Sequence, residues 1–145
     1  MFERYDQSAL RIVFFARQEA SLLRAAQIDS DHLLLGLIFQ DKPLLDRLLS
    51  SPIDTEAIRR RVGDRTIAAE PVATNVDMPL TTGAKLVLSR AFDEANRLNH
   101  QQIGTEHLLY GMLLEEQSFA AEILRGLGLS AETIREDLAN RASGA

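Results

Sequence analysis

The chain has 145 residues, 46% of them hydrophobic and 26% charged, and a formal net charge of −5. These values are typical of one globular domain, and they exclude a nucleic-acid-binding protein that depends on a basic surface. The absence of cysteine excludes disulfides, thiolate metal ligands and a thiol nucleophile. The longest apolar stretch, 33–39, is far shorter than the roughly 18 residues that span a bilayer. We therefore predict a cytoplasmic domain without a membrane or nucleic-acid partner.

The sequence repeats itself with a shift of 75 residues. The segment 27–37 (QIDSDHLLLGL) matches 102–112 (QIGTEHLLYGM), and the match continues on both sides with a slip of one residue downstream. A register kept over both polar and apolar positions indicates a tandem duplication. We divide the chain into repeat one (about 1–63), a connector (about 64–80) and repeat two (about 81–142).

Each repeat is predicted to contain four helices, and no segment alternates convincingly as a strand. The first helix follows Asp6 and runs to about Ala26. The connector contains Pro71 and Pro79 and is predicted to be extended. The remaining boundaries follow cap and stop signals. The second helices begin at 30 and 105, the third cover 44–49 and 119–124, the fourth follow 54 and 130, and the first helix of repeat two covers 81–98. The predicted fold is therefore all-α, with two pseudo-symmetric four-helix halves.

The second helix of each repeat begins with a hydroxyl residue followed by an acid. Ser30 and Thr105 are predicted to cap the helix, and the acids Asp31 and Glu106 suit the positive end of its dipole. A glycine inside each of these helices, at 36 and 111, is predicted to let a neighbouring helix approach closely.

Three histidines and two lysines are the candidates for chemistry. His32 and His107 match between the repeats, His100 has Ala25 in its place, and no His-Glu-x-x-His motif exists, so we predict structural histidines and no metal. Thr105, Glu106 and His107 are consecutive and cannot form a triad. The lysines, at 42 and 85, are not part of a P-loop, so we predict no cofactor and no enzyme.

Six bulky side chains are predicted to belong mostly to the core, with a remaining groove between the repeats for hydrophobic segments or an adaptor. They are Phe14, Phe15, Leu22, Phe39, Tyr110 and Phe119. The only basic run, 59–61, is interpreted as a solvated helix end.

The motif IGTEHLLYGM at 103–112, preceded by AFDEAN at 91–96 and followed by ILRGLGL at 123–129, resembles the Clp N-terminal repeat of Clp/Hsp100 unfoldases. The start, MFERY, is most similar to the ClpC branch. The resemblance implies a bundle of eight helices that binds unfolded or marked substrates and adaptor proteins for a Clp ATPase ring, in cis or in trans. The alternative is a stand-alone accessory protein that docks on such a ring and regulates or stabilises it.

The resemblance also implies a ligand site. In ClpC-type domains the glutamate of Gly-Thr-Glu-His, here Glu106 beside Thr105, engages phosphorylated arginine on marked substrates. A carboxylate can pair with a guanidinium, and helix N-terminal amides can accept a phosphate. Repeat one has Asp29, Ser30 and Asp31 instead, so we expect the shorter Asp31 to contribute less than Glu106. The alternative, that both acids only match the helix dipole, remains open.

Overall fold

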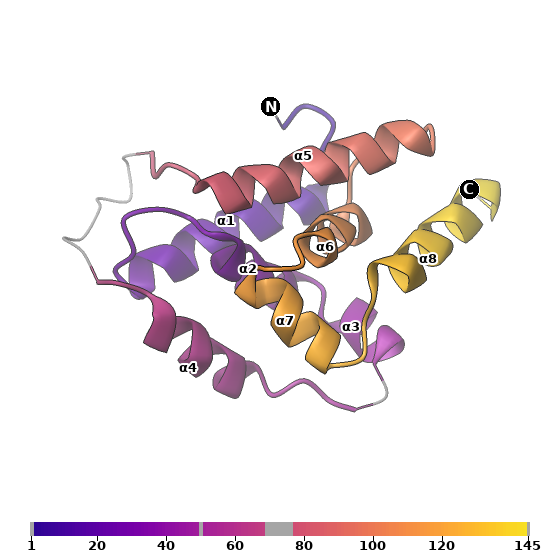
Figure 1. Cartoon of the computed structure of the whole chain (residues 1–145). Helices are drawn as coiled ribbons and strands as arrows, with labels where there is room; N and C mark the ends of the chain where they lie inside the picture. The colour runs from indigo at the N-terminus through magenta and orange to yellow at the C-terminus, as the bar shows by residue number, and fades with distance from the viewer. Residues whose placement is uncertain (1, 50, 69–76, 145) are drawn as a thin grey trace.

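The computed structural model describes residues 2–49, 51–68 and 77–144, and these form eight helices and no strand (Figure 1). The predicted all-α fold of two four-helix halves is confirmed. Repeat one contains α1 (Gln7–Leu22), α2 (Ser30–Gln40), α3 (Lys42–Leu48) and α4 (Thr55–Arg65), and repeat two contains α5 (Thr82–Arg97), α6 (Thr105–Leu114), α7 (Phe119–Gly126) and α8 (Ala131–Gly144).

The first helix of each repeat ends in the same turn. Arg24 and Asn99 both adopt the left-handed conformation, with φ of 63° and 59°. The next N–H then returns to the helix, from Ala25 to the Ala20 oxygen and from His100 to the Ala95 oxygen, at 2.8 Å each. Because this turn stops α1 at 22, the predicted end at Ala26 was wrong.

The connector between the repeats is only partly described. Helix α4 continues to Arg65, and residues 66–68 and 77–79 are not helical. Pro79 accepts a hydrogen bond from Ile28, whereas Pro71 lies outside the described residues. The extended conformation at Pro71 and the exact division into repeats stay predictions.

The segment before the first helix of each repeat pairs with the segment before the second helix of the other repeat. Tyr5 forms an isolated β-bridge with Ile103, and Leu80 forms the matching bridge with Ile28. Residues 5 and 80 are equivalent in the two repeats, and so are residues 28 and 103. The two bridges are therefore related by the repeat symmetry. Reciprocal pairing of this kind ties the two halves into one core.

Helices α2 and α6 lie in the middle of the molecule, with α1 and α5 on one side (Figure 1). Helix α1 packs most extensively against α2, and α5 against α6. A Cβ added to Gly36 would lie 2.4 Å from the Ile12 oxygen, and one added to Gly111 would lie 2.4 Å from the Val87 oxygen. The predicted role of these glycines in close helix approach is therefore confirmed by the geometry.

An ion pair between a buried glutamate and a partly exposed arginine joins the first and fourth helices of each repeat. Arg59 contacts Glu19 at 2.9 Å, and Arg135 contacts the equivalent Glu94 at 2.9 Å. Hydrogen bonds from Arg97 and Arg135 lower the pKa of Glu94 to about 2, although burial opposes them. The interpretation of the basic run as a solvated end was thus wrong for Arg59, which fastens α4 to α1.

The prediction that most of the six bulky side chains belong to the core was wrong, because only Tyr110 is buried, Phe15 and Phe119 are half-buried and the other three are exposed. Phe14 and Leu22 are 58% and 75% exposed, and Phe39 is also exposed. Phe14 and Leu22 lie on the face of α1 that α2 does not cover, where they line a pocket of about 460 Å³. Across the described ranges, no helix is both long and apolar enough to cross a membrane.

Candidate functional site

The hydroxyl residues do not cap α2 and α6. Asp29 and Gly104 occupy the cap positions, and Ser30 and Thr105 are the first helical residues. The Ser30 N–H bonds to Oδ1 of Asp29 at 2.8 Å, whereas the buried Oγ1 of Thr105 has no hydrogen-bond partner among the described residues. The capping role predicted for both hydroxyls was therefore wrong by one residue.

At both helix starts, a histidine side chain accepts a hydrogen bond from the backbone N–H of the cap residue. Nδ1 of His32 accepts a hydrogen bond from the Asp29 N–H, and Nδ1 of His107 accepts one from the Gly104 N–H, each at 2.9 Å. Burial lowers the pKa of His32, and burial together with His100 and Arg141 lowers the pKa of His107 to about 4. Both rings are therefore neutral, with the proton on Nε2. The prediction of hydrogen-bonded structural histidines is confirmed.

Glu106 lies in an enclosed acid cluster at the start of α6. Its residue is 6% exposed, and Oε1 accepts a hydrogen bond from Nη1 of Arg141 on α8. Burial is the main cause that raises the pKa of Glu106 to about 7; the neighbouring acid Asp137 adds to the shift, and Arg141 opposes it. This carboxyl group therefore already holds a guanidinium and lies beside a second acid.

Asp31 lies at the start of α2 and is as buried as Glu106, since each residue is 6% exposed. Its Oδ2 is 3.7 Å from Nε of Arg65, and it lines two pockets of about 270 and 390 Å³. Burial, and then the charge of Asp29, raises the pKa of Asp31 to about 6, while Arg65 opposes the shift.

The two arginines occupy equivalent positions, because Arg65 and Arg141 match with the one-residue slip that also relates Arg59 to Arg135. The fourth helix of each repeat thus brings a guanidinium to the acid of its own second helix. Both guanidinium side chains remain more than half exposed, at 56% and 54%. Sequence reasoning missed Arg65 because the predicted boundary placed it in the connector, although the repeat shift could have found it.

The four predicted ligand residues therefore form two separate clusters. Ser30 and Asp31 lie with Arg65, and Thr105 and Glu106 lie with Arg141. Among the described residues, no group of three or more His, Asp or Glu side chains could hold a metal ion.

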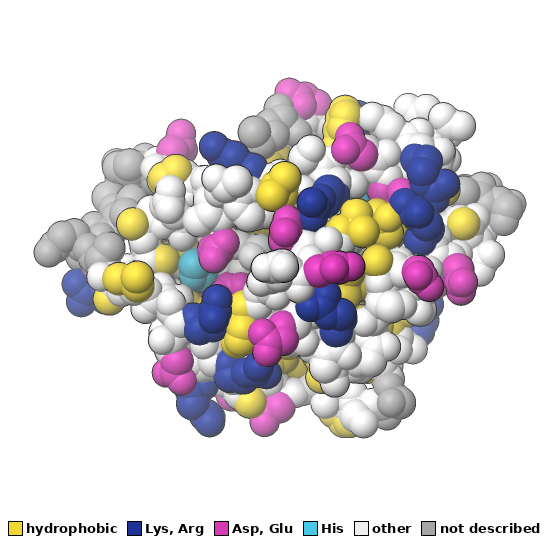
Figure 2. Space-filling model, viewed as in Figure 1, with side chains coloured by type: hydrophobic (Ala, Val, Ile, Leu, Met, Phe, Trp, Pro, Cys, Tyr) yellow, Lys and Arg dark blue, Asp and Glu magenta, His cyan; other side chains and the backbone are white. Residues whose placement is uncertain are grey.

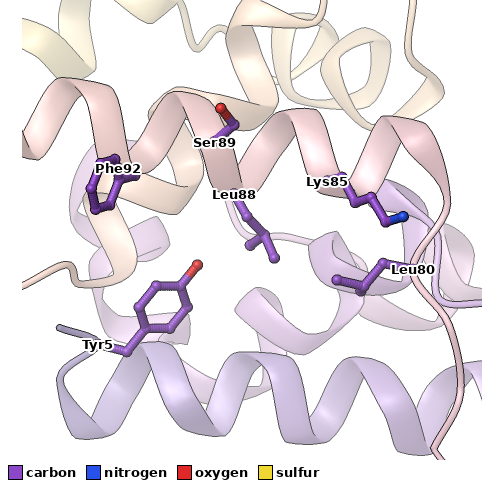
Figure 3. Close-up of a pocket in the computed structure, with 6 residues that line it drawn as sticks. All are labelled: Tyr5, Leu80, Lys85, Leu88, Ser89 and Phe92. Carbon is purple, nitrogen blue, oxygen red and sulfur yellow. The ribbon is translucent and has the colours of Figure 1, made fainter. Parts of the chain in front are cut away.

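A groove lies between the N-terminal segment and α5, but none of the six bulky side chains from which the sequence predicts a groove lines it. Figure 3 shows Tyr5, which comes from the N-terminal segment, opposite Phe92 and Leu88 of α5. The groove has a volume of about 300 Å³, and its lining also includes Leu80, Lys85 and Ser89. Burial raises the pKa of the Tyr5 hydroxyl to about 12, so that it stays neutral. On the face shown in Figure 2, acidic and basic side chains are interspersed with apolar ones.

Comparison with known protein families gives a match to the Clp repeat N-terminal domain over residues 4–93 and 79–143. The chain belongs to this family. It is 35% identical over 136 residues to the chloroplastic chaperone proteins ClpC1 of Arabidopsis thaliana and of Oryza sativa subsp. japonica. The matched region is 93% of this chain but only 14% and 15% of those proteins. Domains of this family are non-catalytic binding domains, which agrees with the prediction that the chain is not an enzyme.

Solved structures show the same fold. The N-terminal domain of the chaperone ClpD from Arabidopsis thaliana has a TM-score of 0.72 and 24% identity, and the match covers 99% of this chain and 97% of that one. The Hsp104 N-terminal domain from Candida albicans also has a TM-score of 0.72 and 24% identity, with coverage of 92% and 88%.

Proposed function

We propose that this Clp N-terminal domain recruits protein substrates or adaptors to a Clp ATPase ring, in cis or in trans. The relatives support this role, because several are named as ATP-binding subunits of the ATP-dependent Clp protease. The groove lined by Tyr5, Leu88 and Phe92 offers an apolar surface for such chains. The cytoplasmic location stays a prediction of the sequence.

We further propose that the acids at the starts of α2 and α6 bind the guanidinium of phosphoarginine on marked substrates. One observation carries this proposal: each acid already holds a guanidinium from its own chain, Asp31 that of Arg65 and Glu106 that of Arg141. A site that accepts an internal guanidinium has the charge and hydrogen-bond acceptors that an incoming one needs. The helix N-terminus beside each acid suits the phosphate.

Both acids are 6% exposed, but the looser ion pair and the adjoining pockets favour Asp31 as the main site. Asp31 is held by Arg65 at 3.7 Å and lines two pockets, so a ligand can reach it from solvent. Glu106 binds Arg141 closely, with the acid Asp137 beside it, so a ligand has to displace the Arg141 guanidinium. The proposal therefore reverses the ranking from residue type, which put Glu106 first.

Titration calorimetry with free phosphoarginine tests this proposal. We expect heat of binding with the wild-type protein, a loss of most of it in Asp31→Ala, and a smaller loss in Glu106→Ala. A hydrogen bond to a charged group contributes about 1.5–3 kcal/mol, so losing the main carboxylate weakens binding by at least about tenfold. Asp46→Ala on the exposed side of α3 controls for net charge and should bind like the wild type.

The absence of heat with folded wild-type protein would remove the phosphoarginine proposal and leave both acids as helix-dipole partners. The recruitment proposal has a separate test, in which the domain is used as bait for an unfolded model substrate and for a purified Clp ring. Capture of the substrate supports recruitment. Capture of the ring alone supports the accessory alternative.

A further inference from the structure

The residue after the left-handed turn differs between the repeats. Ala25 follows Arg24, and His100 follows Asn99, and the two N–H groups return to equivalent carbonyl oxygens at the same distance, 2.8 Å. The Cβ atoms of Ala25 and His100 therefore start from the same place in the two halves. Repeat two carries an imidazole there, and repeat one carries only a methyl group.

In repeat two, this imidazole pairs with the buried histidine of α6. Nδ1 of His100 lies 2.8 Å from Nε2 of His107, and the two rings meet edge to face with centroids 5.0 Å apart. Because Nδ1 of His107 accepts from the Gly104 N–H, its Nε2–H is the donor in the pair. His100 thus supplies the acceptor that a buried donor requires.

In repeat one, the equivalent donor has no acceptor within the part of the chain that the structure describes. His32 is 3% exposed, its Nδ1 accepts from the Asp29 N–H, and its Nε2 has no hydrogen-bond partner among the described residues. Ala25 and His32 line the same pocket of about 390 Å³, and Asp31 and Arg65 form part of its wall. An unpaired buried N–H is unfavourable, so this pocket suits a group that brings an acceptor.

We propose that the pocket of repeat one binds an imidazole ring, the side chain of a histidine in a bound polypeptide. The ring's unprotonated nitrogen accepts the Nε2–H of His32, as His100 does for His107 in the other half. The exposed side chains at the rim, Ile67 at 89% and Arg65, move aside to admit the ring. An imidazolium has no acceptor, so the bound ring is neutral. This inference does not depend on phosphoarginine, although the two ligands share a wall of the pocket.

Titration with free imidazole, followed by NMR at alkaline pH where imidazole is unprotonated, tests the proposal. We expect saturable shifts of the His32 ring and the Ala25 amide at about millimolar concentration, as suits so small a ligand. Pyrrole, which has the ring shape and an N–H but no acceptor, should cause no saturable shift. Ala25→His should fill the pocket, satisfy His32 and abolish imidazole binding. Equal shifts with pyrrole, or unchanged binding in Ala25→His, would overturn the proposal.

A variant of repeat two should gain the same imidazole site and serves as the matched test. His100→Ala removes the acceptor from His107, so imidazole should then bind in repeat two as well and restore part of the lost thermal stability. Binding to His100→Ala in repeat two but not to repeat one of the wild-type protein would overturn the proposal, because it would show that the repeat-one pocket does not admit the ring. Absence of imidazole binding in both proteins would overturn it too.

Discussion

The two repeats share the same backbone arrangement and differ in some of the side chains placed on it. Both have the reciprocal bridges, the glycine that lets two helices meet, and a buried glutamate held by an arginine of the fourth helix. They differ at the start of the second helix. Both acids are buried, but Arg141 binds Glu106 closely, whereas Arg65 lies 3.7 Å from Asp31, which borders a pocket. The backbone approaches and the Glu–Arg pair are thus the same in both halves, whereas several other polar side chains differ.

The cap residues show this divergence most clearly. Where the repeats cross, Thr81 donates a hydrogen bond to Oδ1 of Asp29 at 2.7 Å. At the equivalent crossing the acid is on the other partner: Asp6 lies beside Gly104, where an added Cβ would be 2.6 Å from its Oδ2. Each of these two places thus contains one carboxylate. In one place it comes from the residue before the second helix, and in the other from the residue before the first helix.

The largest expected effect tests the shared frame. Gly36→Ala and Gly111→Ala should each destabilise the fold by about 2–3 kcal/mol, because the new methyl group meets a backbone oxygen that cannot turn away. Denaturant unfolding measures the loss. Gly126→Ala at the end of α7 is the control, since an added Cβ there has no atom within 4 Å, and we expect it to gain up to about 1 kcal/mol. If Gly111→Ala were as stable as Gly126→Ala, close approach would not explain the glycine.

The fold was predictable to a large extent because its signals are local or repeated. The caps Asp6, Thr81 and Asp54 announce helices directly, and the shift of 75 residues reveals the two halves. The site was less predictable because it depends on partners distant in sequence. No sequence pattern near Asp31 indicates that Arg65 pairs with it. Histidine is not a usual cap residue, so the bond between His32 and the Asp29 N–H had no local sequence signal either.

A smaller effect should sharpen the difference between the two acids. The pKa of Glu106 is raised from 4.5 to about 7 in the folded state. As the pH rises, the unfolded state therefore loses this proton first, and the free energy of unfolding falls between about pH 4.5 and pH 7. Glu106→Gln should remove this loss and gain about 1–2 kcal/mol relative to wild type above pH 7. Asp31→Asn should show a similar but lower window, from 3.8 to about 6. Urea unfolding across pH measures both, and identical profiles for wild type and Glu106→Gln would contradict the enclosed setting of Glu106.

The smallest expected effect concerns the left-handed turns. Asparagine tolerates positive φ better than arginine does, so Arg24→Asn should stabilise the fold and Asn99→Arg should destabilise it, each by about 0.3–0.5 kcal/mol. Thermal unfolding of the two reciprocal variants measures the difference. Shifts of the same sign in both variants would show that the turns are not equivalent.

We expect repeat one to supply the main ligand-binding acid, although both repeats share the same backbone arrangement. An NMR titration of the labelled protein with phosphoarginine tests it most directly, because the amides of both helix starts are observed together. We expect the largest shifts at Asp29, Ser30 and Asp31, and we expect these shifts to saturate and to disappear in Asp31→Ala. Saturable shifts confined to Thr105 and Glu106, with none at the start of α2, would contradict it.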